Sequence, residues 1–246
     1  MNGNELLQTI CALPPESAAA AIMRHAERFP IADPADPTLA EITPRGAAAA
    51  EAFGARITGF DCVRIFHSPI KRCQQTAECI ARGVASAGLA VDFDGPQAIL
   101  GIDYIRDLVE VGRLSVQHSN AFVRHWFAGE FPETVIQPAT QIAASKLDWI
   151  TGRLSDPGVR GRRLDLHVSH DWNVIVLREL MLGVCHEDTG WLTFLDGIAF
   201  SVGTAGLRAV YRDRVVEQPL PWRFALVDQW GATQTPLRKA SPAGAD

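Results

Sequence analysis

Two histidines and three arginines each lie just after an apolar run that predicts a β-strand: Arg24, His25, Arg28, Arg72 and His170. The apolar runs are residues 18–23, 62–66 and 164–168. In an open α/β sheet, ligands bind in the crevice beyond the carboxyl ends of the strands. If these strands are parallel, the five side chains meet in one crevice. Few reactions use two imidazoles and several guanidiniums together, and phosphoryl transfer through a phosphohistidine is the leading one.

The segment Arg24–Arg28 carries the clearest pattern, Arg-His-x-x-Arg directly after an apolar strand. A neutral imidazole at His25 could attack a phosphorus atom in line. The guanidiniums of Arg24 and Arg28 would bind the phosphoryl oxygens and stabilise the charge of the group in transfer. Nearby cations should also keep His25 unprotonated at neutral pH. Taken alone, the pattern fits a surface loop of ordinary charges equally well.

The run Ser68-Pro69-x-x-Arg72 places a third arginine in the first turn of a predicted helix. The N-terminal amides of a helix attract anions, so Arg72 would add to a phosphate pocket at that end. By itself, Arg72 would more often be a solvated helix residue, and only the neighbouring motifs favour a functional role.

The run Ser169-His170-Asp171 follows a third predicted strand. His170 could donate a hydrogen bond to a phosphoryl group held opposite His25. Asp171 could protonate a leaving alkoxide and then activate water, which is general acid–base catalysis. The alternative is that His170 only packs at the end of the strand.

Neither a metal nor a cofactor is expected. His167 and His170 are close in sequence, but residues three apart on a strand point to opposite faces. The sequence has no HExxH pair for zinc and no GxxxxGK[ST] loop for ATP.

Predicted strands and helices alternate along the chain, which indicates an α/β fold with a mostly parallel central sheet and helices on both faces. We predict one domain over residues 1–246. Residues 101–138 are the least regular part and predict a lid insertion over the functional edge of the sheet. Residues 238–246 are predicted to form a flexible tail.

Composition limits the possible partners. The net charge of −5 argues against general nucleic-acid binding. The five cysteines form no CxxC pair and no apolar run is long enough to span a bilayer, so we expect a cytoplasmic protein with free thiols and no membrane partner. An edge among the C-terminal strands could pair in a homodimer.

Together these segments resemble the histidine phosphatase superfamily, which includes phosphoglycerate mutases, acid phosphatases and phytases. The resemblance covers, in the family's order, residues 22–28, 43–46, 67–77 and 167–183. It implies a phosphoglycerate mutase-like fold and a phosphorylated His25. It also implies a phosphate pocket made by Arg24, Arg28, Arg72 and His170. Ala26 stands where the family usually has glycine.

The resemblance leaves the proton donor open. One branch of the family places a carboxylic acid after the third strand, and the other places an Asp directly after the second histidine. Asp171 fits the second branch and is favoured. The chain length and the absence of a recognisable signal peptide are typical of the first branch, which makes rivals of Asp103, Asp107 and Glu110.

The expected function is a metal-independent phosphomonoesterase acting on a small phosphorylated metabolite. The alternatives are a phosphoglycerate mutase-like phosphoryl transferase and a non-catalytic binder of phosphorylated ligands. A binder needs no nucleophile, so the histidines and the nearby carboxylate favour an enzyme.

Overall fold

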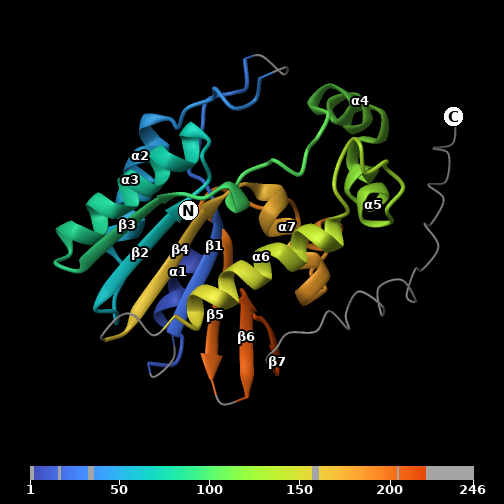
Figure 1. The fold of residues 1–246 in the computed structure, drawn as a ribbon. Helices are drawn as coiled ribbons and strands as arrows, with labels where there is room; N and C mark the ends of the chain where they lie inside the picture. Colours follow the sequence, from blue (N-terminus) through green and yellow to red (C-terminus); the bar gives the residue numbers. More distant parts are fainter. Residues whose placement is uncertain (1–2, 16–17, 33–35, 157–160, 204, 220–246) are drawn as a thin grey trace, which may run out of the picture.

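The computed structural model describes residues 3–15, 18–32, 36–156, 161–203 and 205–219. The predicted tail, 238–246, lies outside the described residues. A seven-stranded sheet with the order β3-β2-β4-β1-β5-β6-β7 forms the centre of the molecule (Figure 1). Its strands are β1 (Ala18–Arg24), β2 (Cys62–His67), β3 (Ala90–Pro96), β4 (Arg163–Ser169), β5 (Gly197–Gly203), β6 (Gly206–Tyr211) and β7 (Arg214–Gln218).

The sheet is parallel at its core and antiparallel at one side. Strands β1 to β4 all pair in parallel, whereas β5, β6 and β7 continue the sheet through antiparallel pairs. The predicted fold class, an α/β fold with a mostly parallel sheet between helices, is confirmed.

Helices cover both faces of the sheet (Figure 1). Helices α1, α2 and α3 contribute to one apolar core, and α4 to α7 contribute to the other. The helices are α1 (Asn4–Cys11), α2 (Pro44–Ala55), α3 (Lys71–Ser86), α4 (Leu108–His118), α5 (Phe122–Phe127), α6 (Ala139–Leu154), α7 (Asp171–Leu182) and α8 (His186–Thr189), with 3₁₀ turns η1 (Ala98–Leu100) and η2 (Ser119–Ala121).

Strand β1 is apolar along its length because helices cover it on both faces of the sheet. Successive side chains of a strand point to opposite faces. Accordingly Ala19 and Met23 pack into the core under α1 to α3, while Ala20 and Ile22 pack into the core under α4 to α7. A strand buried on both faces reads as a continuous apolar run, as this one does.

Helix α2 begins as the sequence predicts. The Thr43 side chain accepts a hydrogen bond from the Gly46 amide at 2.9 Å, and Pro44 occupies the first helical position.

Several elements escaped prediction, among them α1, α4 and β7. Helix α1 starts after Gly3, which provides no side-chain cap. Helix α4 lies inside the segment predicted to be irregular, although the Asp107 carboxylate caps it by accepting from the Glu110 amide at 2.9 Å. Strand β7 follows a turn in which Arg212 has a positive φ of 55°.

The predicted lid segment, 101–138, is built into the protein rather than separate from it. It contains α4, η2 and α5, and its Val111, Phe122 and Trp126 are buried in the core beside α6 and α7. That the segment acts as a lid stays a prediction.

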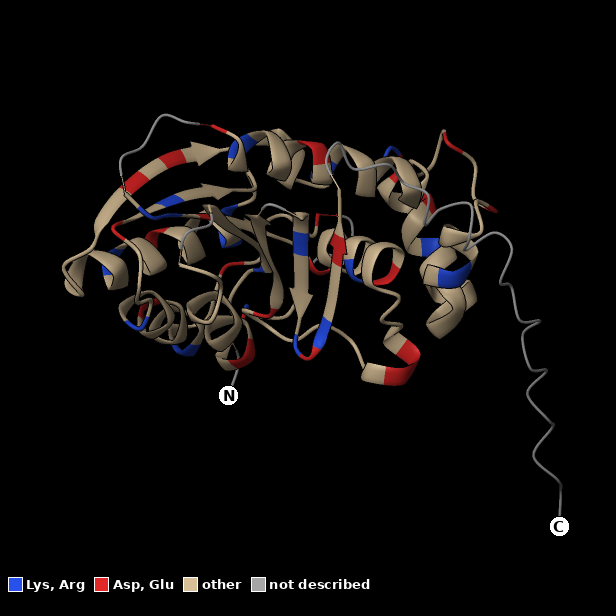
Figure 2. Ribbon diagram, turned by 90° about the horizontal axis from the view of Figure 1, so that it is seen from below, with Lys and Arg blue, Asp and Glu red and all other residues tan. Residues whose placement is uncertain are grey.

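Acidic and basic residues are interspersed along the same elements (Figure 2). Exposed pairs such as Arg113–Glu110 and Arg208–Glu217 join opposite charges at short range. Of the helices in the described ranges, none combines the length and apolar character that crossing a membrane requires.

Substituting Gly83 should destabilise the fold. A Cβ at Gly83 of α3 would lie 2.0 Å from the Glu51 carbonyl oxygen of α2, so the helices would have to separate. We expect Gly83→Ala to lower the free energy of unfolding by about 1–3 kcal/mol, as overpacking does. Urea denaturation would measure it.

Gly152 provides the matched control. It lies inside α6, and a Cβ there would meet no atom within 4 Å. Gly152→Ala should therefore raise the free energy of unfolding by about 0.5–1 kcal/mol through helix propensity. Equal effects of the two substitutions would contradict the close packing of α2 on α3.

Candidate active site

The carboxyl ends of three parallel strands bring the predicted residues together. In the sheet register Arg24 of β1 lies beside Ser169 of β4, and His67 of β2 lies beside Val168. The His25 amide continues the ladder by donating to the Ser169 carbonyl oxygen at 2.9 Å. The residues that follow the three strands therefore meet at one edge of the sheet.

His25 is only 2% exposed and both of its ring nitrogens have partners. Nδ1 lies 2.8 Å from the carbonyl oxygen of Ala26, which can only accept, so Nδ1 carries the proton. Nε2 lies 3.0 Å from Arg72 Nε, which can only donate, so Nε2 presents a lone pair. This tautomer is the one that can act as a nucleophile at Nε2.

Burial, with the adjacent Arg72 guanidinium, lowers the pKa of His25 to about 3. This direction agrees with the neutral imidazole that is predicted for pH values near 7. The sequence argument named nearby cations as the cause, whereas burial is the larger cause in the structure.

Arg72 joins the three parts of the site. Beyond its bond to His25, its Nη2 lies 3.2 Å from Nδ1 of His170, and its Nη1 donates to the Pro37 carbonyl oxygen at 2.7 Å. It lies in the first turn of α3, as predicted, but it is buried rather than solvated. A buried guanidinium held at three points is fixed in direction, which suits a group that orients a phosphoryl oxygen.

His170 is buried beside His25, with ring centroids 5.7 Å apart and the rings nearly perpendicular. Its Nδ1 faces the Arg72 guanidinium, so the proton is on Nε2, which donates to Ser68 Oγ at 2.9 Å. Burial and the charge of Arg72 hold the pKa of His170 well below its usual value. His170 is thus a neutral donor at the edge of the site.

Arg24 and Asp171 form a partly buried ion pair, with Nη2 and Oδ2 3.0 Å apart. The Trp191 indole donates to the same carboxylate oxygen at 3.0 Å. Burial alone would raise the pKa of Asp171, but Arg24, Trp191 and His25 together hold it below its usual value. Asp171 is therefore a carboxylate at neutral pH, which suits a base or an orienting group better than an acid.

Arg28 lies at the edge of this arrangement. It is half-buried, and its Nη1 donates to the Phe29 carbonyl oxygen at 2.9 Å. Its charge contributes to lowering the pKa values of Arg24 and Arg72, for which burial is the main cause. The structure thus brings all six predicted residues to one edge of the sheet. Their catalytic and binding roles stay predictions.

The rival proton donors lie in different surroundings. Asp107 caps α4, and Glu110 is paired with Arg113 on its exposed face. Asp103 is exposed at the rim of a neighbouring pocket that also contains Lys146. None of these contacts identifies a donor.

Two aromatic residues of the site had no sequence signal. The Arg24 guanidinium stacks over the Phe194 ring, 4.3 Å from its centroid, and the Phe194 ring lies 5.8 Å from that of His25. Phe194 and Trp191 precede β5 in a loop without a motif, so only the folding of β5 against β1 could place them here.

One group of three possible metal ligands occurs in the described part of the chain: Glu179, His186 and Glu187. It lies at the junction of α7 and α8. The Arg124 guanidinium bonds to both glutamates and so provides the counter-charge that a metal would provide. The cluster is explained as an ion-pair network that holds α5 against α7 and α8.

Comparison with known proteins identifies a related family and a shared fold. The model of the histidine phosphatase superfamily (branch 1) matches residues 21–93. No curated protein sequence matches the chain. The resemblance to the histidine phosphatase superfamily is thus confirmed by the family match and by a shared fold. The matched residues end before every candidate proton donor, so the match does not select among them.

Several solved structures share the fold. Mycobacterial hydrolase 1 is similar with a TM-score of 0.56 at 16% identity, covering 81% of this chain and 100% of that one. A mycobacterial glucosyl-3-phosphoglycerate phosphatase has a TM-score of 0.53 at 15% identity, covering 80% and 99%. YhfR of Bacillus stearothermophilus has a TM-score of 0.54 at 15% identity, covering 79% and 96%. At these identities the likeness shows the fold.

Buried neutral histidines should make the fold sensitive to acid. Burial is the main cause that lowers the pKa of His167 to about 3, as for His25. The unfolded chain, with histidine pKa values of about 6.5, binds more protons than the folded one between those values. Stability is therefore full above about pH 6.5 and falls as the pH drops toward 3, by up to about 1.4 kcal/mol per pH unit for each such histidine.

His167→Phe tests this linkage away from the candidate catalytic residues. His167 stacks on Phe66 on the side of the sheet covered by α6. The variant should lose a pH-independent amount of stability, because Trp149 loses its acceptor, but should have a shallower decline of unfolding free energy from pH 6.5 to 4. Equal acid slopes in urea denaturation would contradict the pKa assignment.

Proposed function

We propose that the protein is a metal-independent phosphomonoesterase that hydrolyses a small phosphorylated metabolite through a phosphohistidine. The observation that carries this proposal is the buried lone pair of His25 Nε2. Its direction is set by the bond from Nδ1 to Ala26, and it faces the Arg72 guanidinium. A nucleophile without its proton and beside fixed cations is what attack on a phosphate ester requires.

In the first step, His25 Nε2 attacks phosphorus while the bond to the leaving oxygen breaks, and the phosphoryl group moves to the imidazole. The guanidiniums of Arg24, Arg28 and Arg72 bind its oxygens, and neutral His170 can join them as a donor when its Nε2–H turns away from Ser68 Oγ. For the attack, Nε2 exchanges the hydrogen bond that it accepts from Arg72 Nε for the bond to phosphorus, while the bond from Arg72 Nη1 to the Pro37 carbonyl oxygen can keep the guanidinium in place.

In the second step, water attacks phosphorus and the bond to Nε2 breaks, which returns free His25 and releases phosphate. Asp171 takes the proton of the attacking water, a role that its ionised state supports. The same ionised state opposes proton donation in the first step. We therefore expect alcohols of low pKa to leave fastest, since they need no acid.

Two other functions remain as alternatives. A mutase-like transferase would share the first step and pass the phosphoryl group to a second substrate hydroxyl, which requires that water be excluded. A non-catalytic binder would need the arginines but not the lone pair of His25. The position of that lone pair favours catalysis.

The expected partner is the phosphorylated substrate alone. A cytoplasmic location, a homodimer and the absence of nucleic-acid and membrane partners stay predictions. The substrates named for the structural neighbours belong to those proteins, and the proposal for this chain extends only to a small phosphorylated metabolite.

Replacing His25 should abolish turnover. We expect His25→Ala to hydrolyse an aryl phosphate at less than a few per cent of the wild-type rate, because no other side chain offers an equivalent lone pair at this position. Wild-type activity should resist EDTA and fall with vanadate. Acid-quenched wild type should contain phosphohistidine, detectable by ³¹P NMR. His118→Asn, on α4, provides a control histidine variant that should keep its activity.

Retained turnover in the alanine variant would refute the phosphohistidine mechanism. Inactivation by EDTA would indicate a metal-dependent hydrolase instead. A phosphoenzyme that forms but transfers to an added alcohol in preference to water would favour the mutase alternative.

Replacing Asp171 should separate the two steps. Asp171→Asn keeps an oxygen that can accept from Arg24 but removes the base, so an aryl phosphate should still give a burst of aryl alcohol. Steady-state turnover should then fall by roughly 10²–10⁴, the usual contribution of general acid–base catalysis. Stopped-flow absorbance would resolve the burst, with Asp148→Asn on the exposed face of α6 as the control. Loss of the burst would instead assign Asp171 to the first step.

A further inference from the structure

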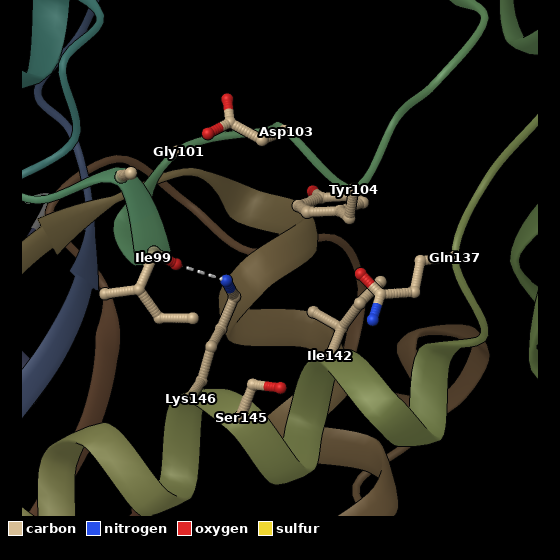
Figure 3. Close-up of a pocket in the computed structure, with 9 residues that line it drawn as sticks. Ile99, Gly101, Asp103, Tyr104, Gln137, Ile142, Ser145 and Lys146 are labelled. Carbon is tan, nitrogen blue, oxygen red and sulfur yellow. Dashed lines mark hydrogen bonds between the residues drawn. The ribbon is translucent and has the colours of Figure 1, made fainter.

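A second pocket lies next to the catalytic residues and has no part in the mechanism above. Its volume is about 290 Å³, and it opens between η1 with the residues after it and helix α6 (Figure 3). Ile99, Tyr104, Gln137 and Ile142 are among its walls, and Lys146 points into it from α6. Its volume is at the small end of ligand pockets and suits a molecule of a few heavy atoms.

The pocket contains a buried cation with spare donors. Lys146 is 2% exposed, and its Nζ donates to the Ile99 carbonyl oxygen at 2.7 Å. An ammonium has three donors, so two are left for a ligand. The described residues place no carboxylate within ion-pair distance of Nζ, and Asp103, at the exposed rim, acts on it only from a distance. Burying an ammonium without a counter-ion is costly.

One of the residues that line the pocket, Tyr104, has a buried hydroxyl without a partner among the described residues. Tyr104 is 7% exposed, and its hydroxyl makes no hydrogen bond to the described chain. The ring is held in place, because it stacks on Trp126 with centroids 6.0 Å apart and lies 5.5 Å from Lys146 Nζ. Buried polar groups of native proteins almost always have a partner, so this hydroxyl is free to bond to a water molecule or a ligand.

The electrostatic state of Lys146 agrees with a site that favours an anion. Burial lowers the pKa of Lys146 to about 7, and Asp103 opposes this only in part. An anion in the pocket would restore the charge of the ammonium.

We propose that this pocket binds the carboxylate of a small organic acid, with Lys146 and the Tyr104 hydroxyl as its two donors. One ammonium and one hydroxyl match the two oxygens and single charge of a carboxylate. A phosphate dianion is better served by several guanidiniums, which the catalytic site supplies and this pocket lacks. The apolar side chains of Ile99 and Ile142 would contact the carbon skeleton.

The pocket is close enough to the catalytic site to influence it. The charge of Lys146 contributes to the low pKa of His170, after burial, Arg72 and His25. Two adjacent carbonyl groups connect the pocket to the residues around His170. The Ile99 carbonyl oxygen accepts from Lys146. The Leu100 carbonyl oxygen accepts from Ser169 Oγ and from Asn173. The carboxylate could thus belong to the substrate or to a separate acid that binds beside it.

Binding can be measured without turnover, so the outcome does not depend on the proposed phosphatase activity. The chain has three lysines, and ¹³Cε-lysine labelling of the full chain should resolve them by NMR. Acetate, succinate and benzoate would be titrated at constant pH and ionic strength. We expect at least one to shift the Lys146 signal saturably and to leave that of exposed Lys71 unchanged. Lys146→Met assigns the signal.

The two tyrosines of the chain provide a matched pair of variants. Tyr104→Phe should weaken carboxylate binding roughly fivefold, the effect of one hydrogen bond, without lowering stability, because its hydroxyl is unpaired. Tyr211→Phe should leave the affinity unchanged but lower stability, because the Tyr211 hydroxyl donates to Asp196 at 3.0 Å.

Substrate kinetics distinguish the two sources of the carboxylate, and saturation with vanadate tests whether the pocket is separate from the phosphate position. A separate acid should still bind when vanadate occupies the catalytic site. If the substrate supplies the carboxylate, a carboxylate-bearing aryl phosphate should have a lower KM than phenyl phosphate, and Lys146→Met should remove that advantage. The proposal is overturned if none of the three acids shifts the Lys146 signal, if inorganic phosphate binds there more tightly than they do, or if Tyr104→Phe leaves the affinity unchanged.

Discussion

The site depends on one interaction, the hydrogen bond from Arg72 Nε to Nε2 of a buried, neutral His25. A cation beside a histidine opposes protonation of the ring, and burial opposes it further. Hydrogen bonds that involve a charged group are worth about 1.5–3 kcal/mol, so this contact also holds the guanidinium in direction. The same contact keeps the imidazole unprotonated and the guanidinium oriented, and the proposed attack on phosphorus takes its place at Nε2.

The parallel register of β1, β2 and β4 makes this contact possible. The strands end at the same level, so residues that follow them from three distant parts of the chain become neighbours. The antiparallel strand β5 then adds what the parallel half does not provide. The loop before β5 brings Trp191 and Phe194 against Asp171 and Arg24. Arg24 is the main group that keeps the carboxylate ionised, Trp191 adds to its effect, and Phe194 stacks on the guanidinium.

The same short segment, residues 99–101, separates two groups of hydrogen-bond donors. The carbonyls of Leu100 and Gly101 bond to Asn173 on the catalytic side, whereas the carbonyl of Ile99 bonds to Lys146 on the other. The catalytic site has several guanidiniums close together, and the pocket on the far side has a single ammonium and an unpaired hydroxyl. A phosphoryl group and a carboxylate are the anions that match these two donor sets.

The sequence by itself determined the elements whose signals are local. The apolar runs of β1, β2 and β4, the Thr43 cap of α2 and the order of strands and helices were sufficient to predict the fold class. The motifs after the strands were sufficient to predict which residues would meet. The tertiary structure alone decided the tautomer of His25, the ionised state of Asp171 and the place of Phe194, and it revealed the pocket around Lys146. These properties depend on burial and on contacts between residues far apart in the chain, and a charge or a tautomer is set by what surrounds a group rather than by its neighbours in sequence.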